Sequence, residues 1–287
     1  MRCLFEDRPS SDQMQHFSGE KNTGHQIILF RDQANEKHNL TSNHHHVDQK
    51  NYRAHIRLRY LTPQILVMRT SANDYACDLG TNLQALIDAL NTPALPEAEI
   101  NLVLSNRKAA YGLTRAAQAN PPIPTAYLAL QPYLKQNPGK TREDYDAEVA
   151  KIVLRTKPEL VVLAGWMHIL SESFLELLDG RKAVEGEDIS PRKPIPVINL
   201  HPALPGQFDG AGAIERAFEA FQKGEISRSG AMVHRVVKDV DRGEPLVIRE
   251  VPFVQGETLE DYEERLHGVE HKIIVEATKR VLDETTL

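Results

Sequence analysis

Short apolar segments alternate with amphipathic segments along residues 64–287. Four apolar runs predict buried strands: "QILVM" (64–68), "EINLVLSN" (99–106), "ELVVLAGWM" (159–167) and "PVINL" (196–200). Between these runs apolar residues recur at helical spacing, as in "TNLQALIDALN" (81–91) and "TREDYDAEVAKIVLRTKP" (141–158). Strands that alternate with helices predict an α/β fold, with a mostly parallel sheet and helices on both faces.

The C-terminal third follows a different pattern. The segments "SGAMVHRVV" and "EPLVIREVPF" flank the turn-like "KDVDRGE", which predicts an antiparallel pair of strands at one edge of the sheet. Residues 258–284 form one long amphipathic stretch, which predicts a closing helix. We therefore expect a parallel sheet with an antiparallel C-terminal extension.

Residues 1–62 are hydrophilic and rich in histidine, and only "IILF" (27–30) resembles a strand. We interpret 1–62 as a poorly ordered or unmatched segment and 63–287 as the functional domain. The run His44–His46 could bind a metal ion, but no cysteine or carboxylate pattern surrounds it, so we predict no metal site.

Composition narrows the functional classes. The 287 residues carry a formal net charge of −6, which gives no case for a nucleic-acid or membrane-surface partner. Cys3 and Cys77 form no CxxC motif, and no apolar run approaches the roughly 20 residues of a membrane span. The N-terminus has no apolar signal core. We expect a soluble, cytoplasmic protein, either monomeric or homodimeric.

Polar residues stand where the strand at 196–200 ends. Asn199 and His201 are two positions apart, so they lie on the same side of an extended chain. In parallel α/β sheets, ligands bind at the carboxyl ends of strands. We favour a functional site, although a histidine at a turn is the ordinary alternative. An asparagine amide can donate a hydrogen bond to an oxyanion, and an imidazole can move a proton.

Two further loops add chemistry. Asp239 and Asp241 lie in the loop "KDVDRGEP", where a carboxylate could orient His201, although "DRG" alone is more often just a turn. Gly80 and Thr81 begin a predicted helix, with Thr81 in position to cap it. Free N–H groups at a helix start bind phosphate, and an ordinary helix cap is the alternative.

Taken together and in order, the motifs resemble the phosphoribosylglycinamide formyltransferase family of purine biosynthesis, in its stand-alone, fungal-like form. They are "LGTNLQALIDAL", "LVLSNRKAAYGLTRA", "TREDYDAEV", "PELVVLAGWMHILS", "NLHPALPG", "GAIERA", "VHRVVKDVDRGEP" and "EHKIIVEATKRVL". The resemblance covers residue 64 to the C-terminus. It implies the Rossmann-like formyltransferase fold and transfer of a formyl group from 10-formyltetrahydrofolate to the amine of glycinamide ribonucleotide, with no metal. It also implies that Asn199 and His201 stabilise the oxyanion and that Asp241 assists proton transfer.

The resemblance also implies two sets of binding residues. The folate pocket would be lined by Met167, His168, Ile169, Leu170, Val237, Lys238, Asp239 and Val240. The ribonucleotide would contact Gly80, Thr81, Asn82, Arg142, Pro202, His267 and Glu270. Two positions depart from the family pattern, since His168 stands where arginine is frequent and His267 where bacterial members have a lysine.

A larger departure precedes the predicted phosphate site. The family has a short Gly/Ser-rich loop there, whereas this chain has "RTSANDYACDLG", with Asp74, Tyr75 and Asp78 in place of small residues. Bulky residues do not readily adopt positive φ, and carboxylates repel phosphate. We hypothesise that residues 69–79 reflect a misread exon junction. A folate-binding protein inactivated by this loop is therefore one alternative function.

Other folate and nucleotide enzymes are also alternatives. Formyltetrahydrofolate hydrolase shares the Asn–His–Asp chemistry, but residues 1–62 do not resemble its regulatory domain, and "TNLQALIDAL" favours the transferase. Methionyl-tRNA formyltransferase would carry a further C-terminal domain and a basic surface. A nicotinamide-dependent Rossmann enzyme is disfavoured because no GxGxxG follows a strand.

Overall fold

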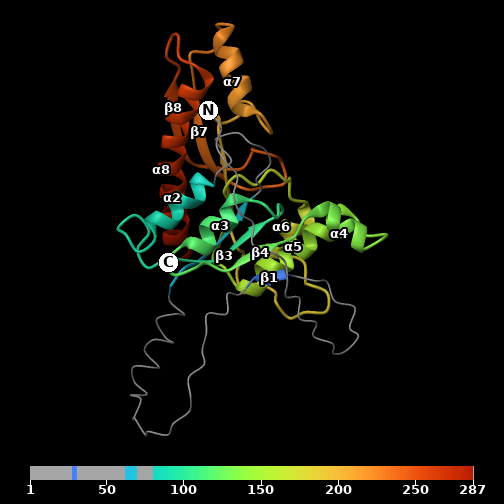
Figure 1. The fold of residues 1–287 in the computed structure, drawn as a ribbon. Coiled ribbons are helices and arrows are strands. Elements are labelled where there is room, and N and C mark those ends of the chain that lie inside the picture. Colours follow the sequence, from blue (N-terminus) through green and yellow to red (C-terminus); the bar gives the residue numbers. More distant parts are fainter. Residues whose placement is uncertain (1–27, 31–61, 70–79, 287) are drawn as a thin grey trace, which may run out of the picture.

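The computed structural model describes residues 28–30, 62–69 and 80–286 (Figure 1). Its centre is an eight-stranded sheet in the order β1-β4-β3-β2-β5-β6-β7-β8. The strands are β1 (Ile28–Phe30), β2 (Gln64–Arg69), β3 (Glu99–Ser105), β4 (Thr125–Tyr127), β5 (Leu160–Leu163), β6 (Val197–His201), β7 (Arg228–Arg235) and β8 (Pro245–Pro252). The helices are α2 (Thr81–Ala89), α3 (Tyr111–Gln118), α4 (Leu130–Gln136), α5 (Arg142–Thr156), α6 (Glu172–Leu178), α7 (Ala213–Gln222) and α8 (Leu259–Thr286).

The sheet confirms the predicted topology. Strands β4, β3, β2, β5 and β6 pair in parallel, while β7 and β8 add an antiparallel extension. Two features were not predicted: the short helix α4, and the pairing of β1 with β4 at the edge of the sheet opposite β8. Strand β1 comes from the segment interpreted as unmatched. The domain boundary at residue 62 stays a prediction.

Alternate residues of the central strands supply two separate cores, one on each face of the sheet. In β2, Ile65 and Val67 pack into the core that is covered by α2, α3, α7 and α8. Their neighbours Leu66 and Met68 pack into the opposite core, beneath α4, α5 and α6. Burial on both faces explains why this strand is continuously apolar rather than alternating.

The helix ends follow local sequence rules, with one correction. Helix α5 begins with a capping box, in which the Thr141 hydroxyl accepts from the Asp144 N–H and the Asp144 carboxylate accepts from the Thr141 N–H. In α2 the N-cap is Gly80, not Thr81 as predicted. The chain enters this helix at φ 77°, a left-handed conformation that favours glycine over threonine.

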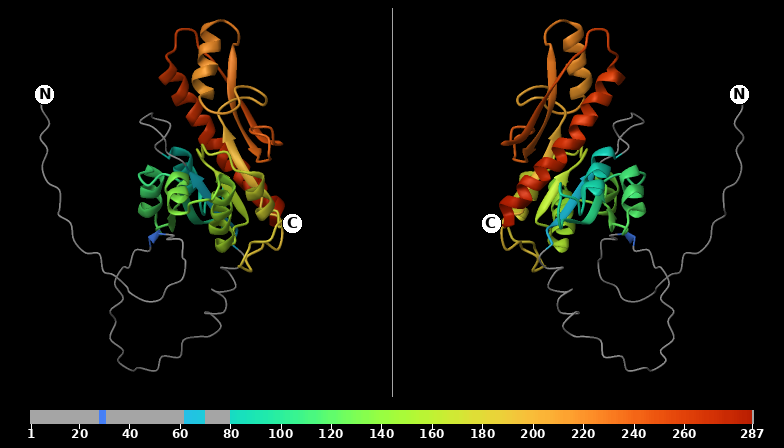
Figure 2. Two further views of the ribbon diagram at one scale, coloured as in Figure 1. Left: turned by 90° about the vertical axis from the view of Figure 1, so that its right-hand side faces the viewer. Right: turned by 90° about the vertical axis from the view of Figure 1, so that its left-hand side faces the viewer.

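Helix α8 runs the length of the domain beside the sheet, and α7, β7 and β8 lie together toward one end (Figure 2). None of the helices in the described ranges is both long enough and apolar enough to span a membrane. The arrangement leaves the carboxyl ends of β5 and β6 facing the loop that joins β7 to β8, and the polar residues of the sequence motifs lie there.

Candidate active site

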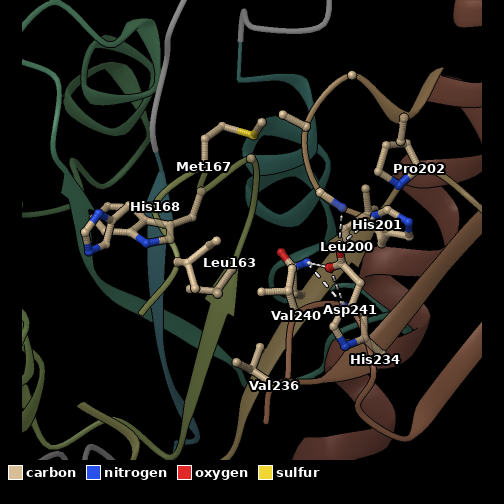
Figure 3. A pocket seen from close by; sticks show the side chains of 18 of the residues that line it. Leu163, Met167, His168, Leu200, His201, Pro202, His234, Val236, Val240 and Asp241 are labelled. Carbon is tan, nitrogen blue, oxygen red and sulfur yellow. Dashed lines mark hydrogen bonds and ion pairs between the residues drawn. The ribbon is translucent and has the colours of Figure 1, made fainter. Parts of the chain in front are cut away.

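Strand pairing brings the predicted catalytic residues together. Antiparallel pairing of β6 with β7 sets Asn199 opposite His234 and His201 opposite Met232. The loop after β7 returns Asp241 to the same point, so its carboxylate lies near both imidazoles (Figure 3). The side chains of His201, His234 and Asp241 are 3%, 3% and 8% exposed. The site is therefore largely shielded from water.

Asp241 is held at both carboxylate oxygens. Oδ2 accepts the Gly210 N–H at 2.9 Å and lies 3.5 Å from His201 Nδ1, while Oδ1 accepts from Asn199 Nδ2 at 3.3 Å. Burial raises the pKa of this carboxyl. However, the hydrogen bonds from His234 and the Gly210 N–H, with the charges of His201 and His234, outweigh burial and lower the pKa to about 2. Asp241 is thus a carboxylate at neutral pH.

The "DRG" motif shapes the loop that carries this carboxylate. Asp241 has φ 55°, in the left-handed region that aspartate tolerates better than most residues with a Cβ. A Cβ added to Gly243 would stand 1.6 Å from the Arg235 carbonyl oxygen. Only glycine fits that close approach, so the motif has a steric reason beyond an ordinary turn.

The two histidines have defined proton positions. Nε2 of His201 lies 3.0 Å from the Gln207 carbonyl, and Nδ1 of His234 lies 2.8 Å from the Arg235 carbonyl. A carbonyl only accepts, so both of these nitrogens carry a proton. The second nitrogen of each ring faces Asp241. A proton on that nitrogen would make the ring cationic and pair it with the carboxylate.

His234 is the residue of the cluster that the sequence analysis did not assign. Its Nε2 lies 3.3 Å from Asn199 Nδ2 and 3.4 Å from Asp241 Oδ1, so it contacts both predicted catalytic partners. In the sequence it occupies one position of a strand with few polar residues, "GAMVH". An isolated polar residue inside a strand that is otherwise buried was the available signal.

A cavity of about 400 Å³ opens beside this cluster, a volume typical of small-molecule sites. It is lined by every predicted folate-contacting residue: Met167, His168, Ile169, Leu170, Val237, Lys238, Asp239 and Val240. Four of its apolar side chains are notably exposed, namely Met167 (58%), Ile169 (55%), Val237 (45%) and Val240 (37%). An exposed apolar wall inside a cavity suits a flat, largely apolar ligand.

One wall of the cavity is fixed to the domain by polar contacts. His168 Nε2 lies 2.6 Å from Oδ1 of the fully buried Asp146, whose Oδ2 accepts the Ser171 N–H at 2.8 Å. Arg142 Nη2 donates to the Ile169 carbonyl. Lys238 and Glu172 form an ion pair at 2.8 Å that links this wall to the facing loop. The segment 167–171 is therefore anchored mainly to α5.

The other end of the cavity holds polar residues from α2 and α8, together with Pro202. Asn82 Nδ2 donates to Glu270 Oε2 at 3.2 Å. Burial raises the pKa of Glu270 to about 7, and the bond from Asn82 offsets this only in part. Burial, with the neighbouring His271, lowers the pKa of His267. His267 therefore carries less positive charge at neutral pH than a lysine at this position would.

Three predicted substrate residues do not line the cavity: Gly80, Thr81 and Arg142. Gly80 lies at the start of α2, and a Cβ added to it would stand 3.4 Å from Arg69 Cζ and 3.3 Å from Arg115 Nε. Two guanidinium groups, neither of them assigned from the sequence, therefore flank this helix start. Most of the stretch interpreted as a misread junction, residues 70–79, lies outside the described residues, as does His44–His46.

Within the described ranges, no group of three or more histidine, cysteine, aspartate or glutamate side chains is arranged to hold a metal ion. The cluster of Asn199, His201, His234 and Asp241 offers hydrogen-bond donors, one carboxylate and two imidazoles. Such a set can stabilise developing negative charge on a carbonyl oxygen and move a proton away from an amine.

This cluster suits chemistry at a carbonyl carbon, and the class of the protein follows from its similarity to a known family. The family profile described as "Formyl transferase" matches residues 75–184 and 186–278. The chain belongs to the formyl transferase family of enzymes.

Within that family the chain is similar to phosphoribosylglycinamide formyltransferases, as the motifs implied. It is 48% identical to the enzyme of that name from Schizosaccharomyces pombe over 207 residues, which cover 71% of this chain and 93% of the relative. For the Saccharomyces cerevisiae enzyme the figures are 44% over 216 residues, 71% and 94%. The crystal structure of phosphoribosylglycinamide formyltransferase from Streptococcus pneumoniae superposes with a TM-score of 0.59 at 25% identity, covering 77% of this chain and 99% of that one.

Proposed function

We propose that the chain transfers the formyl group of 10-formyltetrahydrofolate to the amine of glycinamide ribonucleotide, a step of de novo purine biosynthesis. The observation that carries this proposal is the cluster of Asn199, His201 and Asp241 at one side of a cavity whose other walls suit a folate and a phosphorylated sugar. The names of the relatives from fission and budding yeast support phosphoribosylglycinamide as the acceptor of the formyl group.

The chemistry is an acyl transfer without a covalent enzyme intermediate. The amine nitrogen of the ribonucleotide attacks the formyl carbon, and the formyl oxygen becomes an oxyanion in a tetrahedral intermediate. The bond from this carbon to the folate nitrogen then breaks. The amine loses a proton and the departing folate nitrogen gains one, so no other reactant is needed. The protein has to stabilise the oxyanion and move the proton.

Asn199 and His201 would stabilise the oxyanion. Asn199 Nδ2 donates to Asp241 Oδ1 at 3.3 Å and lies 3.3 Å from His234 Nε2. These contacts are long, so either can be exchanged for the formyl oxygen at low cost. His201 in its cationic form faces the same space and favours negative charge there.

Asp241 is suited to proton transfer because it is ionised. It pairs with the protonated form of His201 and can accept the proton that leaves the attacking amine, directly or through water. A carboxyl with a pKa of about 2 is a weak base. The proton therefore leaves after the attack, when the amine nitrogen of the tetrahedral intermediate is ammonium-like and acidic.

We assign one substrate to each end of the cavity from the chemistry of its lining. The folate rings would lie against the apolar wall of Met167, Ile169, Val237 and Val240. The ribose hydroxyls would contact Glu270, which accepts hydrogen bonds when ionised. The phosphate would lie at the start of α2, near Gly80, Thr81 and Asn82, where the helix dipole favours an anion.

One assay tests the proposal and separates it from its alternatives. Loss of the formyl group from 10-formyltetrahydrofolate is followed with and without glycinamide ribonucleotide, for the full chain and for Asp241→Asn. We expect turnover only with the ribonucleotide, and a loss on the order of 100-fold or more in the variant.

Turnover without the ribonucleotide would contradict the proposal and indicate a formyltetrahydrofolate hydrolase instead. Binding of folate without any turnover would indicate that residues 69–79 disable the phosphate site. Glu244→Gln, at an exposed carboxylate of the same loop as Asp241 that does not line the cavity, serves as the matched variant for a change of charge alone.

A further inference from the structure

The loop between β6 and α7 contacts the reactive cluster through its backbone rather than through its side chains. The Gln207 carbonyl accepts from His201 Nε2 at 3.0 Å, and the Gly210 N–H donates to Asp241 Oδ2 at 2.9 Å. Residues 210–215 also form part of the cavity wall. The position of this backbone therefore decides how both His201 and Asp241 are held.

The loop has a conformation that needs support. Phe208, Gly210 and Gly212 all have positive φ, at 50°, 82° and 65°. The left-handed region is unfavourable for a residue with a Cβ such as phenylalanine. Because three of these five residues are left-handed, several of their carbonyl groups point toward one another. Carbonyl dipoles that converge in this way repel unless a hydrogen-bond donor lies between them.

Arg216 supplies that donor. Its Nη2 donates to the carbonyls of Phe208, Asp209 and Ala211 at 2.7, 2.8 and 2.9 Å, and its Nε donates to the Gly212 carbonyl at 3.1 Å. Its guanidinium carbon also lies 5.9 Å from the centre of the Phe208 ring. One side chain on the first turns of α7 thus binds four carbonyls of the five-residue segment 208–212.

We infer that Arg216 is a positioning residue of the reaction, which acts on Asp241 through the backbone of residues 208–212. It does not line the cavity, and it touches neither Asp241 nor His201 in the contacts described. The planar guanidinium matches several carbonyls at fixed angles, which a lysine ammonium cannot reproduce. The effect of Arg216 on the rate rests on the proposed formyl transfer. Its effect on the segment 208–212, which includes the Gly210 N–H bound to Asp241, rests on geometry alone.

The test combines amide hydrogen exchange with kinetics on the full-length chain. The variants are Arg216→Met, which keeps the apolar stem, Arg216→Lys, and Lys223→Met as a control. Lys223 lies just after the same helix, is exposed and is 3.8 Å from Glu219. We expect the Gly210 amide to exchange at least about tenfold faster in Arg216→Met than in the parent chain, with no change in Lys223→Met.

The formyl-transfer kcat should fall on the order of 10- to 100-fold in Arg216→Met, because small misplacements of a reacting group are costly. Arg216→Lys should lie between that variant and the parent. Circular dichroism and the thermal midpoint should show that Arg216→Met is folded.

Three results would overturn the inference: unchanged exchange at Gly210, faster exchange throughout α7 rather than in residues 208–212, or faster Gly210 exchange with an unchanged kcat. If the parent chain shows no turnover, the proposed function fails, and Gly210 exchange still decides whether Arg216 holds this loop.

Discussion

Oδ1 of Asp241 lies 3.4 Å from Nε2 of His234, while the other oxygen of the same carboxylate faces His201. The carboxylate is thus placed between two imidazoles, and each ring is held at its other nitrogen by a backbone carbonyl. A negative charge fixed in this way organises the donors around it. Its loss should be felt both in catalysis and in the dependence of stability on acid.

The low pKa of Asp241 predicts a stability change in acid. A carboxyl whose folded pKa is about 2, below its ordinary value of 3.8, stabilises the fold above pH 3.8, and this contribution is lost as the pH falls toward 2. Asp241→Asn should therefore lose less stability than the parent chain between pH 4 and pH 2.5. Thermal midpoints across this range measure the effect. Asp239→Asn, in the same loop, should follow the parent curve.

Replacing His234 should slow catalysis and leave substrate binding nearly unchanged. His234→Gln keeps polar atoms in place but removes the ring that contacts Asn199 and Asp241. We expect kcat to fall by about tenfold, which corresponds to about 1.4 kcal/mol, while KM for both substrates changes little. Steady-state kinetics at pH 7.5 test this. An unchanged kcat would show that the contacts of His234 with Asn199 and Asp241 are only structural.

Sequence reasoning predicted most of the residues that the structure brings together at the candidate site, because strand ends and a tight glycine-bearing loop are visible in the sequence. Asn199 and His201 interrupt an apolar strand, and Asp241 lies in a loop whose glycine has no room for a side chain. His234 also interrupts an apolar strand, but that mark does not show which residues it contacts. Its role depends on antiparallel register, which places it opposite Asn199 although 35 residues separate them.

The remaining misses have the same origin, since they depend on contacts across long sequence distances. Asp146 lies on α5 within a helical pattern, and only the fold shows that it binds His168. Arg69 and Arg115 approach Gly80 from β2 and α3. The cap of α2 was misassigned for a local reason, because a left-handed entry at Gly80 is not distinguishable by composition from a capping threonine.

The buried Glu270 predicts a stability change with the opposite sign to that of Asp241. Its pKa is raised to about 7 from an ordinary 4.5, so its contribution to stability is complete below pH 4.5 and is lost as the pH rises through 7. Glu270→Gln should gain stability relative to the parent chain at pH 8 and not at pH 4.5. The shift bounds this gain at on the order of 3 kcal/mol.

Denaturant unfolding at pH 4.5 and pH 8 measures the Glu270 effect. Glu264→Gln, an exposed position on the same helix, is the matched control and should show no such difference between the two pH values. A gain for Glu270→Gln that is equal at both pH values would mean that the carboxylate is not the cause. In the transfer reaction, Glu270→Gln should raise KM for the ribonucleotide more than KM for the folate.

Two substitutions of His168, the partner of Asp146, distinguish the effect of its polar contact from that of its packing. Asp146 is fully buried, and its oxygens are taken by His168 and by the Ser171 N–H. His168→Ala would leave the buried carboxylate with one hydrogen-bond partner fewer, and leaving a buried polar group unsatisfied typically costs about 1–3 kcal/mol, or more for a charged group. The segment 167–171 would also lose an anchor, so KM for the folate should rise.

His168→Arg places a permanent cation next to Asp146, and arginine pairs with carboxylates through two parallel donors. We expect this variant to keep most of the parent's thermal midpoint and folate KM, whereas His168→Ala loses both. Thermal unfolding and folate-dependent kinetics, run on the two variants together, give the comparison. If His168→Arg fails as badly as His168→Ala while remaining folded, the packing of the imidazole against Tyr145 and Trp166, at 5.4 and 6.1 Å between ring centres, fixes this wall rather than its charge.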